Sequence, residues 1–518
     1  MQSISFSITD DISWPGQLLV LCLLICVFLC GKAVWEATVS NLPPGPWGLP
    51  IIGASFLLRK DPHLAFTNVA QKYGNVFSLM LGNRLVVVLN GLHAIEETII
   101  KHPKAFAGRP SLHTFSLANS KTGSLSLSDY TPRWRLARRI AVSAIHNFVK
   151  DSDALGHKLS QESQRLIRYF KQQKGRPVNA LAALKSATAN IILNALFGIN
   201  WSYDDEGLRR IIDLADSFRQ AIHGCSHVDF LPMVKYLPNK ALSDLKTVMK
   251  IVSDILSQLF VQNKETYDGV NVRNIADSFM SVVEKETEKE KENHPEGLTI
   301  APLLSDEQII PAVADLFGAG FETSSALLYW SLAYLIKYPE IQQQLHDELD
   351  QVIGQERLPT LGDIPSLPLL RATVFELLRV TSMVPLAIPR STTSETKIQD
   401  FTVPKDTIVF VNLWSVHRDP ALWKDPEVFD PRRFLDRAGQ VVDPKFFRGF
   451  LPFSGGRRKC PGEVLAIKQV SVLLAALLHS FRFSQDGLSN EYQGINLVGQ
   501  FGLTLIPETF YVKINERC

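Results

Sequence analysis

Residues 453–462 read Phe-Ser-Gly-Gly-Arg-Arg-Lys-Cys-Pro-Gly, and this stretch decides the fold. It places Cys460 in a glycine- and arginine-rich turn directly before an apolar segment that is predicted to be a helix. The glycines are expected to let the backbone approach a flat cofactor, where a Cβ would collide. The start of a helix favours a thiolate, because the helix dipole and the unpaired N–H groups stabilise negative charge there. The stretch therefore predicts a thiolate presented to a metal, with Arg458 available for an acidic group on the cofactor.

The same segment fits the pattern Phe-x-x-Gly-x-Arg-x-Cys-x-Gly at every fixed position, so the chain resembles the cytochrome P450 family. The haem iron of that family takes an axial cysteine thiolate, and the resemblance implies haem b (iron protoporphyrin IX) with Cys460 as the metal ligand. The alternative from the residues alone is a buried cysteine inside a cationic loop. That alternative would leave the Phe, Gly and Arg positions unexplained.

Further stretches resemble family landmarks, in the family's order, along nearly the whole chain. The sequence Glu376-Leu-Leu-Arg379 resembles the family's Glu-x-x-Arg pair, and its spacing puts both charges on one helical face. Residues 429–434 resemble the later loop from which an arginine, here Arg433, joins that pair in a buried network. Arg432 departs from the usual Glu. Without the resemblance, Glu376 and Arg379 would be an ordinary surface ion pair.

A long helix is predicted upstream of that pair. Ser305 and Gln308 form a capping-box pattern, and apolar periodicity continues to Lys337 before Pro339 ends it. At 1.5 Å per residue this helix is roughly 50 Å long. Pro311 is expected to kink its first turns.

The centre of this helix, residues 319–323, resembles the helix that covers the distal haem face in the family. Gly318 and Gly320 each cost about 1 kcal/mol relative to Ala in a helix interior, so something is expected to approach the backbone there. Oxygen and substrate are the candidates, and close helix packing is the alternative. By the resemblance, Glu322 and Thr323 are the catalytic residues that help deliver protons.

Three arginines and a tryptophan complete the predicted cofactor site. Trp134 and Arg138 stand four apart in a stretch that resembles the family's haem-propionate helix, and Arg390 matches another propionate contact. Two cofactor carboxylates inside a protein need paired cations, because unpaired buried charge is costly. Arg138, Arg390 and Arg458 would supply these cations, although each alone would be read as a surface charge.

The composition excludes several other classes. Among 518 residues, 54 Lys and Arg nearly balance 52 Asp and Glu, which argues against nucleic acid as a partner. The six cysteines suggest no disulfide framework, which favours a reducing compartment. His223 and His227 could suggest zinc, but Cys225 would point away from both on a helix. The Gly318-x-Gly320 pair lacks the third glycine of a dinucleotide site, so electrons must come from another protein.

The N-terminus predicts one membrane anchor. The apolar run 18–31 can be extended upstream towards the roughly 20 residues that span a bilayer, and Trp14 and Trp35 flank it. Acidic residues before it and Lys32 after it favour a luminal N-terminus and a cytosolic body. A cleaved signal peptide is the alternative. The predicted divisions are 1–36, the anchor; 37–50, a proline-rich hinge; and 51–518, the haem-thiolate catalytic domain.

The body is predicted to be one mainly α domain with a small β region. Residues 76–81 and 85–89 flank Gly82-Asn83, which is a hairpin signal, and 408–413 is a further strand. The run 284–292 alternates Glu and Lys without apolar residues and is interpreted as a solvated linker.

The resemblance implies a monooxygenase of the endoplasmic reticulum membrane, single-pass with a cytosolic catalytic domain. It would insert one oxygen atom of O₂ into a lipophilic substrate with electrons from an NADPH-dependent flavoprotein reductase, and cytochrome b5 is a second candidate partner. A basic docking surface for such a partner is expected at Arg133, Arg135, Arg139, Arg448, Arg457, Lys459 and Lys468. A reductase-independent isomerase or dehydratase and a non-catalytic haem protein are the alternatives. Thr323 argues against the first, since such relatives often lose that residue.

Several stretches resemble the animal aryl-hydrocarbon and steroid hydroxylase branch in particular, among them residues 106–110 and 315–321. That resemblance implies an aromatic xenobiotic or a steroid-like substrate. The candidates for the substrate pocket are Phe115, Phe218, Val384, Leu386 and Phe501. Ordinary core packing is the alternative for these side chains.

Overall fold

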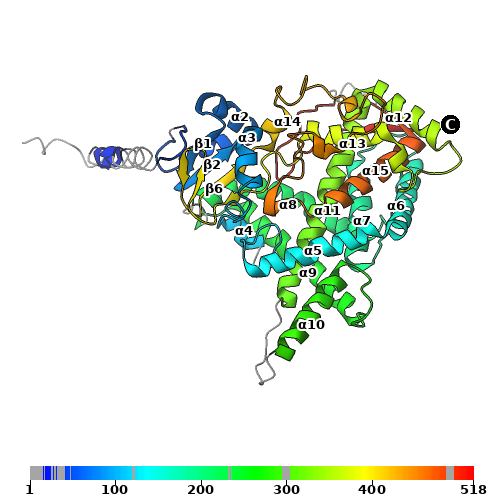
Figure 1. The fold of residues 1–518 in the computed structure, drawn as a ribbon, viewed down its shortest axis with the longest axis horizontal. Helices are drawn as coiled ribbons and strands as arrows, with labels where there is room; N and C mark the ends of the chain where they lie inside the picture. The colour runs from blue at the N-terminus through cyan, green and yellow to red at the C-terminus, as the bar shows by residue number, and fades with distance from the viewer. Residues whose placement is uncertain are drawn as a thin grey trace, which may run out of the picture.

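The computed structural model describes residues 16, 18–24, 27, 31, 41–46, 48–118, 123–231, 234, 236–293, 304–485 and 495–517. Helices dominate this part of the chain, as predicted (Figure 1). They are α2 (Pro62–Tyr73), α3 (Gly91–Ile95), α4 (His113–Ala118), α5 (Pro132–Lys150), α6 (Ser152–Gln172), α7 (Leu181–Phe197), α8 (Glu206–Phe230), α9 (Lys240–Glu265), α10 (Ile275–Asn293), α11 (Asp306–Lys337), α12 (Pro339–Val352), α13 (Pro368–Thr381), α14 (Leu413–His417) and α15 (Glu463–Ser480).

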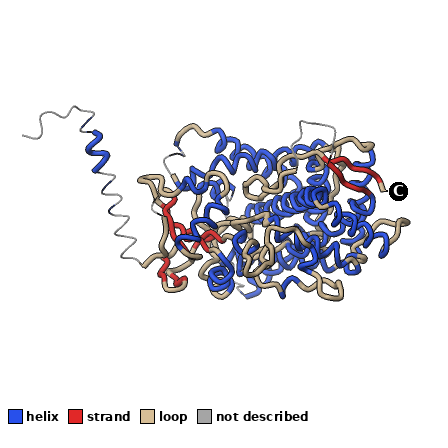
Figure 2. Tube along the Cα trace, turned by 90° about the horizontal axis from the view of Figure 1, so that it is seen from above, coloured by secondary structure: helices blue, strands red, loops and turns tan. Residues whose placement is uncertain are grey.

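The strands of the described residues form one four-stranded sheet, in the order β1-β2-β6-β3, and two separate two-stranded sheets, β4-β5 and β7-β8. Figure 2 shows the four-stranded sheet at one end of the body and the β7–β8 pair at the other. The strands are β1 (Val76–Leu81), β2 (Arg84–Leu89), β3 (Arg390–Ser391), β4 (Thr396–Ile398), β5 (Phe401–Val403), β6 (Ile408–Val411), β7 (Phe481–Gln485) and β8 (Val512–Glu516).

The predicted β1–β2 hairpin is confirmed. Leu81 pairs with Arg84 across a turn in which Gly82 has a φ of 57°, a left-handed conformation that favours glycine. Strand β6 lies parallel to β2, and β3 pairs antiparallel with β6. The predicted strand 408–413 is shorter than expected, because α14 begins at Leu413. This sheet fixes Arg390, which lies on β3 opposite Val409.

The proline-rich hinge is not a free connector where the structure describes it. The Ser78 N–H of β1 donates to the Pro44 carbonyl at 2.9 Å, and the Ser78 hydroxyl donates to Pro43. Gly45 has no room for a Cβ, since one would collide with the Ser78 carbonyl. The hinge is therefore attached to the edge of the sheet.

Helix α11 is the central element of the helical body (Figure 1). It begins and ends where the sequence predicts, with Ser305 and Gln308 forming the capping box and Lys337 as its last residue. Helix α7 packs along it on one side, and α13 and α15 pack against it elsewhere. The main hydrophobic core lies between these helices, with Tyr329 and Trp330 of α11 fully buried in it.

The interpretation of 284–292 as a linker is wrong, because helix α10 continues through it to Asn293. Alternating Glu and Lys residues place opposite charges at i,i+3, and such pairs can support a helix without apolar residues. Most of the predicted anchor lies outside the described residues, but 18–24 are helical and carry exposed leucines.

One helix of the described chain, α15, is long and apolar enough to cross a membrane by length and composition. However, 67% of its apolar stretch is buried inside the body, as expected of a core helix.

Candidate active site

The Cys460 loop connects a short 3-10 turn, η7 (Gly456–Arg458), to the start of α15. The Cys460 N–H donates to the Phe453 carbonyl at 3.0 Å, which closes the loop on itself. Gly462 caps α15, so the thiol stands just before the first turn of this helix, as predicted. The loop thus presents one sulfur atom at a fixed place beside α15.

Gly455 and Gly456 are needed for packing against a neighbouring segment, whereas the prediction was that the loop glycines let a cofactor approach. A Cβ on Gly455 would collide with the Ile100 side chain, and a Cβ on Gly456 would collide with the Ile99 carbonyl. Gly456 also has a φ of 68°. These two glycines let the loop pack on residues 96–100 rather than on a cofactor. Only Gly462 has open space beside it, with the Cys460 sulfur 4.0 Å from an added Cβ.

The surroundings of Cys460 do not by themselves favour the thiolate. Burial raises the pKa of the Cys460 thiol, and the Gly462 N–H, which lies beside the sulfur, partly opposes this. Burial at this cavity therefore opposes the thiolate that the helix start is expected to favour. A cation bound to the sulfur would have to supply the rest of the stabilisation.

Cys460 opens into a cavity of about 280 Å³ between α11, α15 and the segment that leads to β3. Ala319, Gly320 and Thr323 of α11 line this cavity together with Leu465 of α15. Most of the other lining side chains are apolar, which suits a lipophilic ligand. Thr323 and Cys460, far apart in sequence, are thus brought to one space.

The three predicted arginines line the same cavity. Arg390 is fully buried and donates through Nη2 to the Gly455 carbonyl at 2.8 Å, whereas its Nη1 has no partner among the described residues. Burial and then repulsion by Arg138 lower the pKa of Arg390 to about 10. The pKa of Arg458 falls to about 9 for the same reasons, with Arg390 as a further repelling cation. This cluster needs counter-anions.

Arg109 is a fourth cation at this cavity and is itself buried, and it was not predicted. It donates through Nε to the Ser126 carbonyl at 2.6 Å and through Nη1 to the Pro389 carbonyl at 3.0 Å. Burial and the three other arginines lower its pKa well below the usual value. The only sequence signal was its position within the 106–110 stretch.

Trp134 supports the cluster without lining the cavity. Its indole N–H donates to the Leu125 carbonyl at 2.9 Å, so this donor is not available to a cofactor. The guanidinium of Arg458 lies 3.9 Å from the centre of the Trp134 ring, a cation–π distance. Trp134 was predicted to bind the cofactor, but the structure gives it contact with Arg458 instead.

The two predicted catalytic residues of α11 point in different directions. Thr323 lines the cavity and donates its hydroxyl hydrogen to the Ala319 carbonyl at 2.7 Å. Glu322 does not line the cavity and lies 3.4 Å from the Lys185 ammonium on α7. Burial raises the pKa of Glu322. Thr323 is thus in place to act on a ligand, whereas Glu322 faces a neighbouring helix.

The two glycines of α11 also differ in the space around them. A Cβ on Gly320 would lie 2.8 Å from Ile192 of α7, so close helix packing explains this glycine. Gly318 has open space around its position. Gly320 thus both lines the cavity and packs on α7, so the alternative of close helix packing applies to it.

A buried carboxyl on α11, Asp315, also lines the cavity and was not predicted as a site residue. Ser124 and Ser126 donate their hydroxyl hydrogens to its Oδ2 at 2.6 and 2.9 Å, and the Ser126 N–H donates to the same atom at 2.8 Å. Burial raises the pKa of Asp315. One wall of the otherwise apolar cavity is therefore polar.

Only one of the five predicted pocket residues, Val384, lines the cavity. Leu386 is buried in the hydrophobic cluster on the sheet, and Phe115 and Phe501 pack against the same cluster. Phe218 packs against a cluster formed by α8 and α9. These four side chains thus pack in hydrophobic clusters outside the cavity, as the alternative of core packing describes.

The zinc alternative gains no support. The side chains of His223, Cys225 and His227 lie outside those that the structure describes. Among the side chains that it does describe, no group of three or more His, Cys, Asp or Glu could hold a metal ion.

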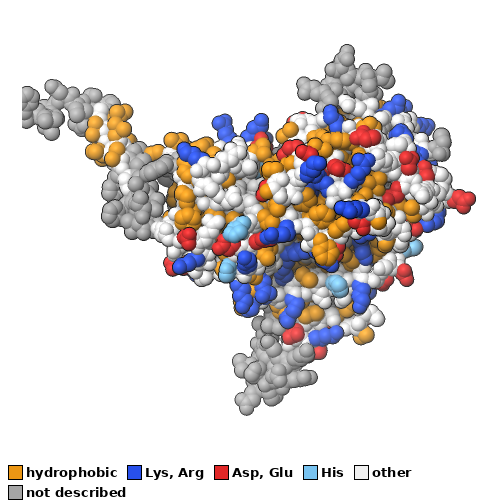
Figure 3. Space-filling model, turned by 45° about the horizontal axis from the view of Figure 1, so that its top comes forward, with side chains coloured by type: hydrophobic (Ala, Val, Ile, Leu, Met, Phe, Trp, Pro, Cys, Tyr) orange, Lys and Arg blue, Asp and Glu red, His pale blue; other side chains and the backbone are white. Residues whose placement is uncertain are grey.

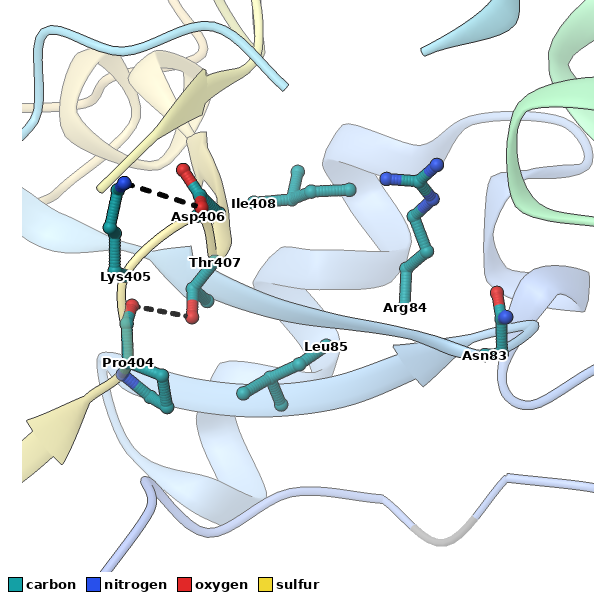
Figure 4. A pocket seen from close by; sticks show the side chains of 8 residues that line it. All are labelled: Asn83, Arg84, Leu85, Pro404, Lys405, Asp406, Thr407 and Ile408. Carbon is teal, nitrogen blue, oxygen red and sulfur yellow. Dashed lines mark hydrogen bonds and ion pairs between the residues drawn. The ribbon is translucent and has the colours of Figure 1, made fainter. Parts of the chain in front are cut away.

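A second hollow, of about 400 Å³, lies on the sheet between the β1–β2 turn and the residues before β6 (Figure 4). There Lys405 Nζ lies 3.9 Å from Asp406 Oδ2, and the Thr407 hydroxyl donates to the Pro404 carbonyl. The described residues that line it include none of the predicted site residues. The candidate chemistry therefore belongs to the Cys460 cavity.

Comparison with known proteins decides the family. The family model "Cytochrome P450" matches residues 43–514. The chain belongs to the cytochrome P450 family. It is 36% identical to "Cytochrome P450 1A2" of Rattus norvegicus over 482 residues, which covers 90% of each protein. It is 33% identical to "Cytochrome P450 1A1" of Platichthys flesus over 92% of this chain and 90% of that protein. It is also 33% identical to "Cytochrome P450 1A3" of Oncorhynchus mykiss over 98% of each.

As a cytochrome P450, the chain is a monooxygenase, an oxidoreductase whose cofactor is haem b. The cavity residues fit this group. Haem brings two carboxylates and a cationic iron, while the cavity offers four arginines, of which Arg109, Arg390 and Arg458 are buried, one carboxyl and a thiol. The partnerless Nη1 of Arg390 is the clearest sign, since a buried guanidinium nitrogen is costly unless an acceptor meets it.

Proposed function

We propose that this cytochrome P450 is a membrane-bound haem-thiolate monooxygenase that inserts one oxygen atom of O₂ into a lipophilic substrate, aromatic or steroid-like. An NADPH-dependent flavoprotein reductase supplies the electrons. The observation that carries the proposal is that one cavity is lined by Cys460, by Thr323 and by a buried arginine with a partnerless nitrogen.

In this proposal the Cys460 sulfur would bind the haem iron. Arg138, Arg390 and Arg458 would hold the two propionates, with Arg109 as a fourth cation. Trp134 supports Arg458, whose guanidinium lies 3.9 Å from the centre of its ring. When bound, haem supplies the redox and oxygen chemistry, which a thiolate ligand promotes.

The distal residues handle protons and substrate. Thr323 can give up its bond to the Ala319 carbonyl and offer its hydroxyl to a ligand in the cavity, or relay a proton from a cavity water. The apolar lining removes water from a lipophilic substrate, and Asp315 and Ser126 form the polar wall that orients it. An aromatic or steroid-like molecule with a polar substituent matches this lining.

Exposed cations and the apolar N-terminal stretch support our proposals for the redox partner and for the membrane location. The predicted basic surface is partly paired, since Arg448 lies 2.8 Å from Glu96 and Lys459 lies 2.6 Å from Glu463. Figure 3 shows a face on which Lys and Arg side chains lie among acidic and hydrophobic ones. Arg133, Arg139 and Arg457 remain exposed and are the cations that we assign to docking an acidic reductase, with cytochrome b5 as a second donor. The apolar stretch around 18–31 anchors the protein in the endoplasmic reticulum membrane, with the catalytic domain cytosolic.

The proposal is tested with the full-length protein in membranes. The reduced carbon monoxide complex should show the red-shifted Soret band of thiolate ligation, and Cys460→Ser should lose it. Cys22→Ser is the matched control, because Cys22 is an exposed cysteine outside the loop, and this variant should keep the band. Retention of the band in Cys460→Ser would refute the ligand assignment.

Turnover decides the reaction class. With reductase, NADPH and a panel of polycyclic aromatics and steroids, at least one substrate should gain one oxygen atom, and labelled O₂ should be its source. Product formed without NADPH would instead identify an isomerase or a dehydratase.

A further inference from the structure

His417 is a fully buried histidine at the end of α14, and both of its ring nitrogens have partners. The Leu451 N–H donates to Nε2 at 3.1 Å, and Nδ1 lies 2.6 Å from the Ser382 hydroxyl oxygen. Because Nε2 accepts a hydrogen bond, the hydrogen of the neutral ring is on Nδ1, which donates to Ser382. The ring therefore connects α14, the end of α13 and the chain segment that leads to Cys460.

On its Nδ1 side the ring is fixed to α13. The Ser382 hydroxyl donates to the Arg379 carbonyl at 3.1 Å, and Arg379 Nη1 donates to the His417 carbonyl at 2.8 Å. Ser382 is the residue directly after α13 and has a φ of 41°. These hydrogen bonds hold the ring in one orientation, with Nε2 directed at Leu451.

On its Nε2 side the ring holds the beginning of the segment that carries Cys460. Residues 452–454 follow Leu451 and line the cavity. The Phe453 carbonyl in turn accepts the Cys460 N–H at 3.0 Å. The place of the sulfur relative to the helical body thus depends on Leu451, and the place of Leu451 depends on the His417 ring.

The surroundings of His417 keep its ring neutral. Among the described residues, the charged groups that act on it are Arg379 and the next residue in the chain, Arg418, while Glu376 is paired with Arg379. Burial and then these two cations lower the pKa of His417 to about 3. Only a neutral imidazole has a nitrogen that can accept the Leu451 N–H.

We propose that His417 is a positioning residue for Cys460, because its Nε2 holds the Leu451 N–H and so keeps the sulfur where it can bind the haem iron. Without this acceptor the Leu451 N–H loses its partner, and the segment shifts until another oxygen or water accepts that hydrogen. A displaced sulfur binds the iron less firmly, so the thiolate Soret band of the reduced carbon monoxide complex is lost sooner. The inference rests on the proposed function, in which Cys460 is the iron ligand, and adds a residue from outside the cavity.

The test compares two substitutions that each keep one half of the hydrogen bonding of the ring. The amide of a glutamine reaches the position of Nε2, whereas the amide of an asparagine reaches only that of Nδ1. His417→Gln keeps an acceptor for Leu451, so its thiolate Soret band should decay within about twofold of the parent rate. His417→Asn keeps the contact with Ser382 but leaves the Leu451 N–H unpaired, so the band should decay about tenfold faster. Both rates are measured with full-length holoprotein at equal haem content.

His346→Leu is the matched control for a general loss of stability. His346 on α12 is also fully buried, and its Nε2 lies 3.2 Å from the carbonyl oxygen of Phe481, at the opposite end of α15 from Cys460. This variant should lower the melting temperature and leave the rate of band decay unchanged. Equal decay in His417→Gln and His417→Asn, or decay in His346→Leu as fast as in His417→Asn, would overturn the inference.

If His417→Asn yields no holoprotein, the pH dependence of band decay decides. The pKa of His417 falls from 6.5 to about 3 on folding, so its stabilising effect is complete above pH 6.5 and is lost as pH falls towards 3. Glutamine takes up no such proton, so decay should accelerate less steeply on acidification in His417→Gln than in the parent, by up to about tenfold per pH unit. Equal slopes would refute the inference. Absence of the thiolate Soret band from the parent protein at neutral pH would refute the proposed function instead.

Discussion

The Thr323 hydroxyl donates a hydrogen bond to the Ala319 carbonyl within α11, and the side chain also lines the cavity. Such a hydroxyl can change partner at little cost, because the carbonyl keeps its helical hydrogen bond. Glu322, the next residue, points to α7 instead. Two neighbours on one helix therefore have different surroundings, Thr323 at the cavity and Glu322 against α7.

The corresponding prediction concerns coupling. Thr323→Ala should keep the haem spectrum and substrate affinity, while product per NADPH falls about tenfold and peroxide rises, since proton delivery is lost. Thr323→Ser keeps the hydroxyl and should remain within about twofold of the parent. Peroxide and product are measured in one reaction with the same substrate. Equal coupling in Thr323→Ala and the parent would show that Thr323 has only a structural role.

Single residues differ in how far sequence could predict them. Cys460 and Thr323 lie in short patterns whose spacing is set by the cofactor, and the structure brings both to the cavity. Gly456 and Trp134 were assigned to the cofactor, whereas the structure shows them in contact with Ile99 and Arg458. These partners are far away in sequence, so no local pattern identifies them.

Among the elements, α13 carries the most tightly paired charges. Arg379 donates to Glu376 through Nε and Nη2, each at 2.7 Å, and both side chains are fully buried. Arg433 adds a contact of 3.3 Å from the 3-10 turn η5 (Pro431–Phe434), as the resemblance implied. The exposed Arg432 reaches only Gln344. The pair is thus a buried joint between a core helix and a loop rather than a surface ion pair.

Removing one partner from this joint should be costly. Glu376→Gln leaves Arg379 buried beside a neutral amide and should reduce the free energy of unfolding by about 3–5 kcal/mol. Arg432→Ala is the control and should change it by less than about 0.5 kcal/mol. Denaturant unfolding followed by tryptophan fluorescence measures both. A loss below 1 kcal/mol for Glu376→Gln would mean that the pair is dispensable for stability.

Elements were predictable where local chemistry and tertiary packing agree. Helix α11 begins at a capping box and has apolar periodicity, and both of its ends lie where the sequence predicts. The β1–β2 hairpin has a glycine at the turn position that needs positive φ. Helix α10 was missed, because its charged second half has no apolar face to indicate a helix.

At the scale of the whole molecule, the hinge at 43–46 belongs to the sheet, since Ser78 binds Pro43 and Pro44. A truncation that starts the chain at Leu42 should therefore release the protein from membranes and keep the thiolate Soret band. A truncation that also removes 43–46 should lower thermal stability, because β1 loses these hydrogen bonds. Membrane fractionation and thermal melts measure the two effects. Equal melting temperatures of the two truncations would show that the hinge contributes nothing to the fold.

The four guanidinium groups at the Cys460 cavity, three of them buried, also bear on how much folded enzyme a cell can make. Such a cluster opposes its own assembly until carboxylates arrive, and a ligand that binds only the native state stabilises that state in proportion to its supply. The yield of this protein should therefore follow haem synthesis as closely as it follows its own messenger. Cells short of haem would send most new chains to proteolysis.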